Sequence, residues 1–191
     1  MTQYLTAEEV AGLGLKRVGR DIMIHRQANI VCPENLSLGD HVRIDGFTTL
    51  LATGEIEIGS HVHISTLCFL AGGAGIQMGD FSGLSHGVKV FSTSDDYSGR
   101  SLTNPTVPAR FKTTQARKVL IGPHSIVGAN SVLLPGATLP EGVAVGALAL
   151  VRGTCKPWSI YAGAPARLAR PRSREALALA AQLLEDEATS R

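Results

Sequence analysis

Two adjacent carboxylates, Asp95 and Asp96, lie in a polar segment over residues 91–118 that reads FSTSDDYSGRSLTNPTVPARFKTTQARK. A neighbouring carboxylate disfavours double ionisation, so Asp96 is expected to raise the pKa of Asp95 and make it a better base. His86 lies shortly before this segment, and the ordinary pKa of histidine, near ~6.5, suits general-base chemistry. Asp95, Asp96 and His86 are therefore the candidate catalytic residues, and their chemistry would be proton transfer from a nucleophile.

The same segment carries polar and basic side chains that could bind a substrate. The basic ones would suit a diphosphate, because a guanidinium forms forked hydrogen bonds to phosphate oxygens. A loop above ~12–15 residues in a compact domain is usually functional or disordered, and Pro105 and Pro108 stiffen this one. We predict an ordered arm that reaches a neighbouring subunit, with a purely structural arm as the alternative. The candidate substrate-binding residues are Tyr97, Arg100, Asn104, Arg110 and Lys112.

Outside this segment, an aliphatic side chain recurs every six residues over most of the chain, for example at Ile44, Leu50 and Ile56, and again at Ile121 and Val127. A helix cannot produce this period, whereas a solenoid with three short strands per coil of ~18 residues can. The sequence therefore predicts an all-β fold, a parallel solenoid of about six coils with the aliphatic side chains in a narrow core. A β-sandwich, which would need a period of two, is the alternative.

Both ends of the solenoid are predicted to be helical. Thr6 and Glu9 have the spacing of a capping box at the start of a short helix, and apolar residues recur at helical spacing over residues 172–188. The predicted parts are an N-terminal helical cap over residues 1–17, a β-solenoid domain over 18–168 with the inserted loop 91–118, and a C-terminal helix within 169–191.

Composition excludes several classes of function. The formal net charge is only +2 and no basic stripe is present, so a nucleic-acid partner is not expected. The three cysteines are widely spaced and contain no CxxC pair, which is typical of reduced thiols in the cytoplasm. The start of the chain lacks the apolar region of a signal peptide, and no apolar run approaches the ~18 residues of a membrane span. We expect a soluble, cytoplasmic protein.

The hexapeptide period and the closing segment PWSIYAGAPAR (residues 157–167) resemble the left-handed parallel β-helix acyltransferase family, in its surface-polysaccharide sugar acetyltransferase branch. The resemblance covers residues 18–168. It implies left-handed coils, a homotrimer with active sites in the grooves between subunits, and transfer of an acetyl group from acetyl-CoA to a sugar. It also implies coenzyme A contacts at Ala129, Ala147, Arg152, Gly153, Arg167 and Arg170.

The chain departs from the family pattern at its catalytic residue, because Asp95 stands where relatives carry a histidine. An unperturbed aspartate, with a pKa near ~3.9, is a weak base for a sugar hydroxyl. A carboxylate can, however, orient an amine and hold the charge of its ammonium form. The departure therefore favours an aminosugar or a nucleotide-linked sugar as acceptor, and N-acetylation over O-acetylation.

Two other classes of function remain open at this point. The γ-class carbonic anhydrases share the fold and bind zinc through three histidines, and His61, His63, His86 and His124 could supply such ligands. A catalytically inactive scaffold would also explain the loss of the family histidine. The transferase hypothesis requires acetyl-CoA as co-substrate and predicts no metal.

Overall fold

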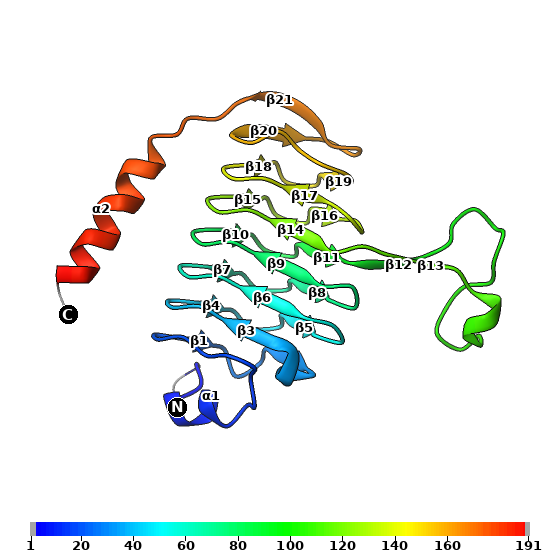
Figure 1. Cartoon of the computed structure of the whole chain (residues 1–191), viewed down its shortest axis with the longest axis horizontal. Helices are drawn as coiled ribbons and strands as arrows, with labels where there is room; N and C mark the ends of the chain where they lie inside the picture. Colours follow the sequence, from blue (N-terminus) through cyan, green and yellow to red (C-terminus); the bar gives the residue numbers. More distant parts are fainter. Residues whose placement is uncertain (1–2, 190–191) are drawn as a thin grey trace.

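Short strands stack coil on coil in a parallel β-helix with three long sheets, which confirms the predicted solenoid (Figure 1). The computed structural model describes residues 3–189, so the outermost residues of the predicted end segments 1–17 and 169–191 lie outside the described residues. Two helices, α1 (Ala7–Ala11) and α2 (Ala176–Thr189), lie at the ends of the chain. Two 3₁₀ turns, at Pro33–Asn35 and Ala109–Phe111, complete the helical elements of residues 3–189.

The three sheets are named here by their number of strands. The eight-stranded sheet contains β1 (Met23–Ile24), β4 (Arg43–Ile44), β7 (His63–Ile64), β10 (Gly83–Leu84), β15 (Ile126–Val127), β18 (Ala144–Val145), β20 (Ser159–Ala162) and β21 (Arg167–Pro171). The six-stranded sheet contains β2 (Asn29–Val31), β5 (Thr49–Leu51), β8 (Phe69–Ala71), β11 (Lys89–Phe91), β16 (Val132–Leu133) and β19 (Leu150–Val151). The five-stranded sheet contains β3 (Leu36–Leu38), β6 (Ile56–Ile58), β9 (Ile76–Met78), β14 (Val119–Ile121) and β17 (Thr138–Leu139).

The aliphatic residue of each hexapeptide points into the core, as predicted. Ile44, Leu50 and Ile56, one from each sheet, are all 0% exposed, and burying a side chain of this size contributes roughly 1.5–3 kcal/mol. Val18 begins the six-residue series that continues at Ile24, and the period therefore places it in the core, but it is an exception and is 40% exposed. It belongs to the first coil, which has no further coil beneath it.

The upper end of the solenoid is longer than predicted. Strand β20, within the closing segment PWSIYAGAPAR, pairs in parallel with β18 and adds a seventh strand layer where about six coils were expected. Strand β21 then folds back antiparallel on β20 and crosses the predicted boundary between residues 168 and 169. Helix α2 consequently begins at Ala176 and not at Arg172.

One corner of the solenoid carries a column of stacked rings, which we call the ring ladder: His41, His61, Phe81, His124 and Trp158. The first three of these residues have φ between 55° and 57°, the left-handed conformation that lets the chain turn sharply between the five- and eight-stranded sheets. Consecutive ring centroids lie 4.7, 4.6, 5.1 and 6.1 Å apart, and the shorter spacings match the ~4.7–4.9 Å between neighbouring strands. The ladder therefore follows from the stacking of the coils.

Helix α1 closes the lower end through a capping box, which confirms the sequence prediction. The amide of Glu9 donates to the Thr6 hydroxyl at 3.2 Å, and the amide of Thr6 donates to the Glu9 carboxylate at 2.8 Å. Val10 is 3% exposed and joins the core. The Glu9 carboxylate also accepts two hydrogen bonds from Arg26, at 2.8 and 2.7 Å, which fastens the helix to the first coil.

This pair predicts a pH-dependent contribution to stability. The hydrogen bonds from Arg26 lower the pKa of Glu9 from 4.5 to about 2, so its ionised form stabilises the fold above pH 4.5, and this stabilisation is lost as the pH falls through about 2. We expect Glu9→Gln to lower the urea midpoint at pH 7, with a smaller difference from wild type as the pH approaches 2. Glu8→Gln is the matched control and should leave the midpoint unchanged. A difference that persists undiminished at pH 2 would contradict the assignment.

Candidate functional site

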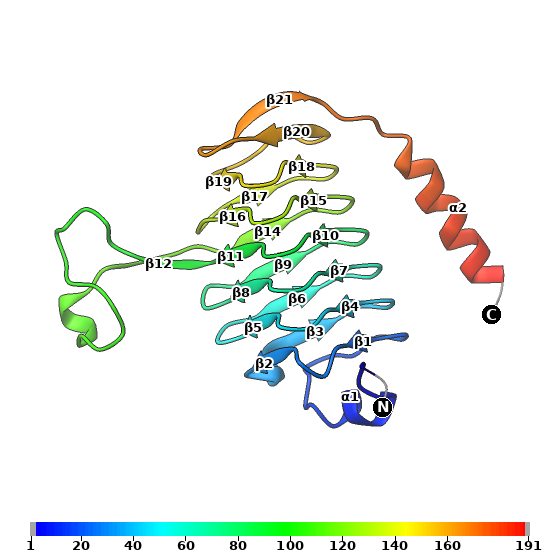
Figure 2. The same ribbon diagram turned by 180° about the vertical axis from the view of Figure 1, so that it is seen from behind.

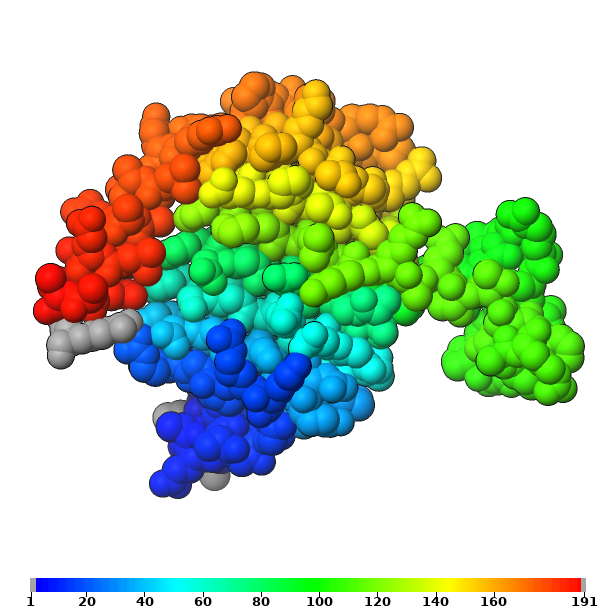
Figure 3. Space-filling model, viewed as in Figure 1, coloured from blue at the N-terminus to red at the C-terminus, as the bar shows by residue number. Residues whose placement is uncertain are grey.

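The predicted arm is an ordered structure that stands away from the solenoid. Strands β12 (Thr93–Asp95) and β13 (Thr114–Ala116) pair antiparallel to form a two-stranded stalk, with Asp95 opposite Thr114. The rest of the arm forms a lobe beyond the stalk, seen at the right of Figure 1 and at the left of Figure 2. Figure 3 shows this lobe joined to the body by a narrow neck. The stalk is what holds Asp95 at a fixed distance from the coils.

Asp95 and Asp96 have different surroundings although they are adjacent. One oxygen of Asp95 accepts a hydrogen bond from the backbone amide of Asn104 at 3.0 Å, and its other oxygen has no hydrogen-bond partner among residues 3–189. Asp96 accepts from the amide and hydroxyl of Ser98, at 2.9 and 2.8 Å, and from the hydroxyl of Ser101. The bonds from Ser98 lower the pKa of Asp96. Asp96 thus shapes a turn, and Asp95 keeps an oxygen available for chemistry.

The predicted substrate-binding residues all lie on the arm. Lys112 donates to the backbone oxygen of Asn104 at 2.8 Å, so both residues gather around Asp95. Tyr97 is 91% exposed. Arg100 donates to the Ser98 hydroxyl at 3.0 Å, and the guanidinium of Arg110 lies 4.6 Å from the centroid of the Phe111 ring. The candidate substrate-binding residues therefore share one element, the arm.

His86 lies on the solenoid and not on the arm. It is exposed at the turn after β10 and lines a cavity of 190 Å³ on the eight-stranded sheet. The other lining residues are His63, Ser65, Gly83, Leu84, Ser85 and Ile126. Asp95 does not line this cavity but lies on the stalk, so within one chain the two candidate bases occupy separate places.

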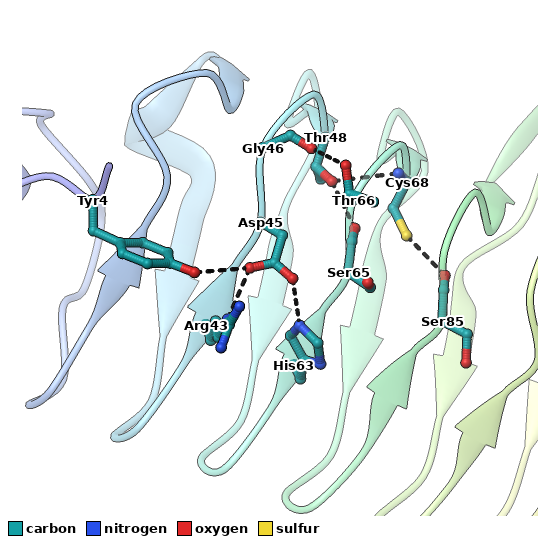
Figure 4. Close-up of polar contacts among 10 residues, drawn as sticks. All are labelled: Tyr4, Arg43, Asp45, Gly46, Thr48, His63, Ser65, Thr66, Cys68 and Ser85. Carbon is teal, nitrogen blue, oxygen red and sulfur yellow. Dashed lines mark hydrogen bonds and ion pairs between the residues drawn. The ribbon is translucent and has the colours of Figure 1, made fainter. Parts of the chain in front are cut away.

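A charged network that we did not predict borders this cavity (Figure 4). Asp45 accepts hydrogen bonds from Tyr4 at 3.2 Å and from Arg43 at 2.8 Å, and lies 2.7 Å from Nε2 of His63. Burial raises the pKa of Asp45, but the contacts with His63 and Arg43 outweigh this effect and lower it. The sequence gives only a weak signal for this network. Asp45 comes beside His63 only through the strand register that pairs Arg43 with His63.

The backbone of Ser85 is fixed by buried polar groups inside the corner. The Cys68 thiol donates to the carbonyl of Ser85 at 3.2 Å, and the Thr48 hydroxyl donates to the carbonyl of Ser65 at 2.8 Å (Figure 4). Burial raises the pKa of Cys68 and of Cys155 to about 11. Both thiols are therefore protonated at neutral pH and unsuited to nucleophilic catalysis.

The predicted coenzyme A contacts lie on the coils after the arm, at two corners and on β21. Ala129 and Ala147 occupy equivalent corner positions of successive coils, and neither amide N–H has a hydrogen-bond partner within residues 3–189. Arg152 and Gly153 are exposed at the next corner, directly after β19. Arg167 and Arg170 are exposed on β21. Unpaired amides beside small side chains can bond a ligand that approaches closely.

The histidines considered as zinc ligands do not converge within the chain. His61 and His124 lie in the ring ladder, His63 faces Asp45, and His86 is exposed in the cavity. None of the helices found between residues 3 and 189 has both the length and the apolar character that a membrane crossing requires.

No protein-family model matches the chain, but individual proteins do. A dTDP-4-amino-4,6-dideoxy-D-glucose acyltransferase of Escherichia coli is 33% identical over 177 residues, which is 92% of this chain and 92% of that protein. WbbJ of Escherichia coli K12, named for O-acetyl transfer in lipopolysaccharide biosynthesis, is 25% identical over 158 residues, covering 80% of this chain and 76% of that protein.

The solved structures give the same picture. AntD, an N-acyltransferase from Bacillus cereus in complex with dTDP and 3-hydroxybutyryl-CoA, has a TM-score of 0.94 and 37% identity, with 98% of this chain and 99% of that chain covered. Other AntD structures carry a replaced serine or a replaced aspartate, and these two residues are ten positions apart. The one with the replaced serine holds dTDP-4-amino-4,6-dideoxyglucose and coenzyme A. From its coils and from this similarity over nearly its whole length, the chain belongs to the hexapeptide-repeat, left-handed β-helix family of sugar acyltransferases.

Proposed function

We propose that this acyltransferase moves an acyl group from a coenzyme A thioester to the 4-amino group of a dTDP-linked 4-amino-4,6-dideoxysugar. The single observation that carries the proposal is the similarity to two proteins linked to this aminosugar nucleotide. The Escherichia coli acyltransferase, which is named for it, matches over 92% of the chain. AntD, whose structure was solved with it bound, matches over 97% of the chain. The similarity of WbbJ, at 25% identity, supports a role in surface-polysaccharide synthesis. The unpaired cysteines are typical of a reducing compartment, and we assign the reaction to the cytoplasm.

A sequence spacing supports Asp95 as the catalytic carboxylate. The serine and the aspartate replaced in AntD are ten positions apart, and Ser85 with Asp95 is the one Ser–Asp pair of this chain with that spacing and order. Ser85 lines the cavity beside His86, and its own role did not emerge from the sequence. The AntD variants are the reason for adding Ser85 to the candidate residues.

In the proposed reaction, the free oxygen of Asp95 binds the ammonium group of the acceptor and takes its proton. The amine nitrogen then attacks the thioester carbonyl, and the carbon–sulfur bond breaks as the thiolate of coenzyme A leaves and takes up the second proton of the attacking nitrogen, so that the products are the amide and free coenzyme A. A backbone N–H of the coils would stabilise the oxyanion. Asn104 and Lys112 hold the arm around Asp95 through their contacts at 3.0 and 2.8 Å.

The remaining predicted residues take binding roles in this proposal. Tyr97, Arg100 and Arg110 would contact the nucleotide diphosphate and its sugar. Ala129 and Ala147 would bond the pantetheine arm through their amides, since their small side chains allow close approach. Arg152 and Gly153 would continue these contacts at the next corner, and Arg167 and Arg170 would bind the phosphates of coenzyme A.

We further propose that the working assembly is a homotrimer. The arm leaves its own coils, so Asp95 needs a surface of another chain to form a closed site (Figure 3). The corner that carries Ser85 and Ala147 also exposes Phe47, Leu67 and Leu148, which are 60, 60 and 71% exposed. An apolar corner of this kind is typical of an interface between copies.

The test is an assay of thiol release with the purified enzyme. We expect release with dTDP-4-amino-4,6-dideoxyglucose and acetyl-CoA or 3-hydroxybutyryl-CoA, and a product whose mass has increased by the acyl group. The matched control acceptor is dTDP-6-deoxyglucose, which has a hydroxyl in place of the amine and should react far more slowly. Equal rates with both acceptors, or no release with either, would overturn the proposed N-acylation.

A further inference from the structure

Helix α2 is tied to the solenoid by a cluster of two histidines and one glutamate. His41 and His61 are neighbours in the ring ladder, and Glu187, near the end of α2, lies against both. Figures 1 and 2 show α2 running down the outside of the coils from the top of the solenoid. No described residue of α2 is buried, and its first half lies over a cavity of 300 Å³. Packing alone therefore fixes this helix weakly.

The separations in the cluster are longer than hydrogen bonds and leave room for an ion among the three side chains. Nε2 of His61 lies 3.4 Å from Oε2 of Glu187, and Nε2 of His41 lies 3.7 Å from Oε1. Both separations are long for a hydrogen bond, for which ~2.7–3.2 Å is usual. Ligands bound tetrahedrally to zinc at ~2.0–2.1 Å are separated by roughly 3.3 Å. All three ligand atoms lie within 4.8 Å of one another, the one such group of ligand residues in the described chain.

The surroundings of His41 add an independent observation. Its Nδ1 lies 3.4 Å from a carboxylate oxygen of Asp21, in the coil below, a separation that a small movement of the exposed Asp21 side chain would shorten to a hydrogen bond, while its Nε2 faces Glu187. Histidines that bind metals usually donate their second ring N–H to a carboxylate, which fixes the ring orientation. The nearby guanidinium of Arg20 does not oppose a cation strongly, because it is paired with Asp40 at 2.7 Å.

The backbone also prepares the site. His41 and His61 both have φ of 55°, and their rings stack at 4.7 Å with 18° between the planes. Two equivalent corner residues of successive coils therefore present the same ring nitrogen to the same side. Because the rings are stacked, both must rotate for their nitrogens to reach one ion.

We propose that His41, His61 and Glu187 bind a divalent transition-metal ion of the zinc type, with water as the fourth ligand, and that this ion clamps α2 onto the solenoid. The site differs from the carbonic-anhydrase arrangement considered from the sequence, because its third ligand comes from the C-terminal helix. It was not foreseen there: Glu187 is 126 positions from His61, and only the fold brings them together. Its role is structural and separate from acyl transfer.

The experiment uses the full chain without a histidine tag, stripped with EDTA, and titrated with Zn²⁺ by calorimetry and with Co²⁺ by visible absorption. We expect one ion per chain, and Co²⁺ absorption bands of a four-coordinate site. Hydrogen exchange of the α2 amides should slow when Zn²⁺ is added. Glu187→Gln and His61→Ala should each weaken Zn²⁺ binding at least about tenfold, and Asp21→Asn about 10- to 100-fold.

Glu185→Gln is the matched control, since it makes the same change on the same helix two positions away, at an exposed residue. It should bind Zn²⁺ as wild type does and keep the slowed exchange of α2. The proposal is overturned if Zn²⁺ does not bind, if Glu187→Gln binds it as tightly as wild type, or if α2 exchanges equally fast with and without the ion. Adventitious binding to other surface histidines would appear as the second of these outcomes.

Discussion

Asp95→Asn is expected to lower kcat/KM for the aminosugar acceptor by about 10²–10⁴-fold, the usual contribution of a positioned acid or base. The carboxamide has nearly the same shape and can still accept the hydrogen bond from the Asn104 amide that Asp95 accepts at 3.0 Å. It cannot hold an ammonium charge or take its proton. The loss should therefore fall mainly on kcat, and the measurement is steady-state thiol release over a range of acceptor concentrations.

Asp96→Asn is the control for this prediction, because the two carboxylates are adjacent and the change is identical. Asp96 is engaged with Ser98 and Ser101, so its replacement should loosen a turn and cost less than about tenfold in kcat/KM. His86→Ala, at the solenoid, should also stay within a few-fold. If Asp95→Asn keeps near-wild-type activity while His86→Ala loses it, the base is the histidine and the proposed role of Asp95 is wrong.

The regular part of the fold was predictable because one physical rule repeats at every coil. Each aliphatic residue of the hexapeptide must leave water, and Ile64, Leu70 and Ile76 are all 0% exposed, as their spacing predicts. The same rule fails at the ends, where a coil has only one neighbour. This accounts for the exposed Val18 and for the closing segment around β20, whose layer forms without the hexapeptide rhythm.

The candidate site could be predicted only in part, because its geometry depends on pairings distant in sequence. Residue types and the interrupted repeat were enough to nominate Asp95, Asp96 and His86 as candidates, and not enough to choose the base among them. In the stalk, Asp95 pairs with Thr114, 19 residues later. The six-residue period does not extend through the arm, so the sequence does not predict this pairing. The different environments of Asp95 and Asp96 depend in turn on local bonds from Asn104 and Ser98. Equal residues at neighbouring positions thus acquire different chemistry from the folded arm.

Gly128→Ala is expected to destabilise the protein by about 3 kcal/mol or more, because it forces extra volume between two coils. A Cβ at Gly128 would lie 2.5 Å from the backbone nitrogen of Ala147 and 2.7 Å from the carbonyl carbon of Gly146. These atoms belong to the next coil and cannot rotate away, so relief requires the coils to separate. Urea unfolding followed by circular dichroism gives the free energy of unfolding.

Gly146→Ala provides the control that isolates this effect, since Gly146 occupies the equivalent position 18 residues later. Its added Cβ would lie 3.4 Å from the side chain of Ala162, an ordinary contact, because the chain above it is the closing segment. The expected loss is within about 0.5 kcal/mol. Both substitutions restrict the unfolded chain equally, so their difference measures the spacing between coils. If both substitutions lowered the free energy of unfolding equally, the local turn would explain why glycine is needed. The close stacking of the coils would then not be the cause.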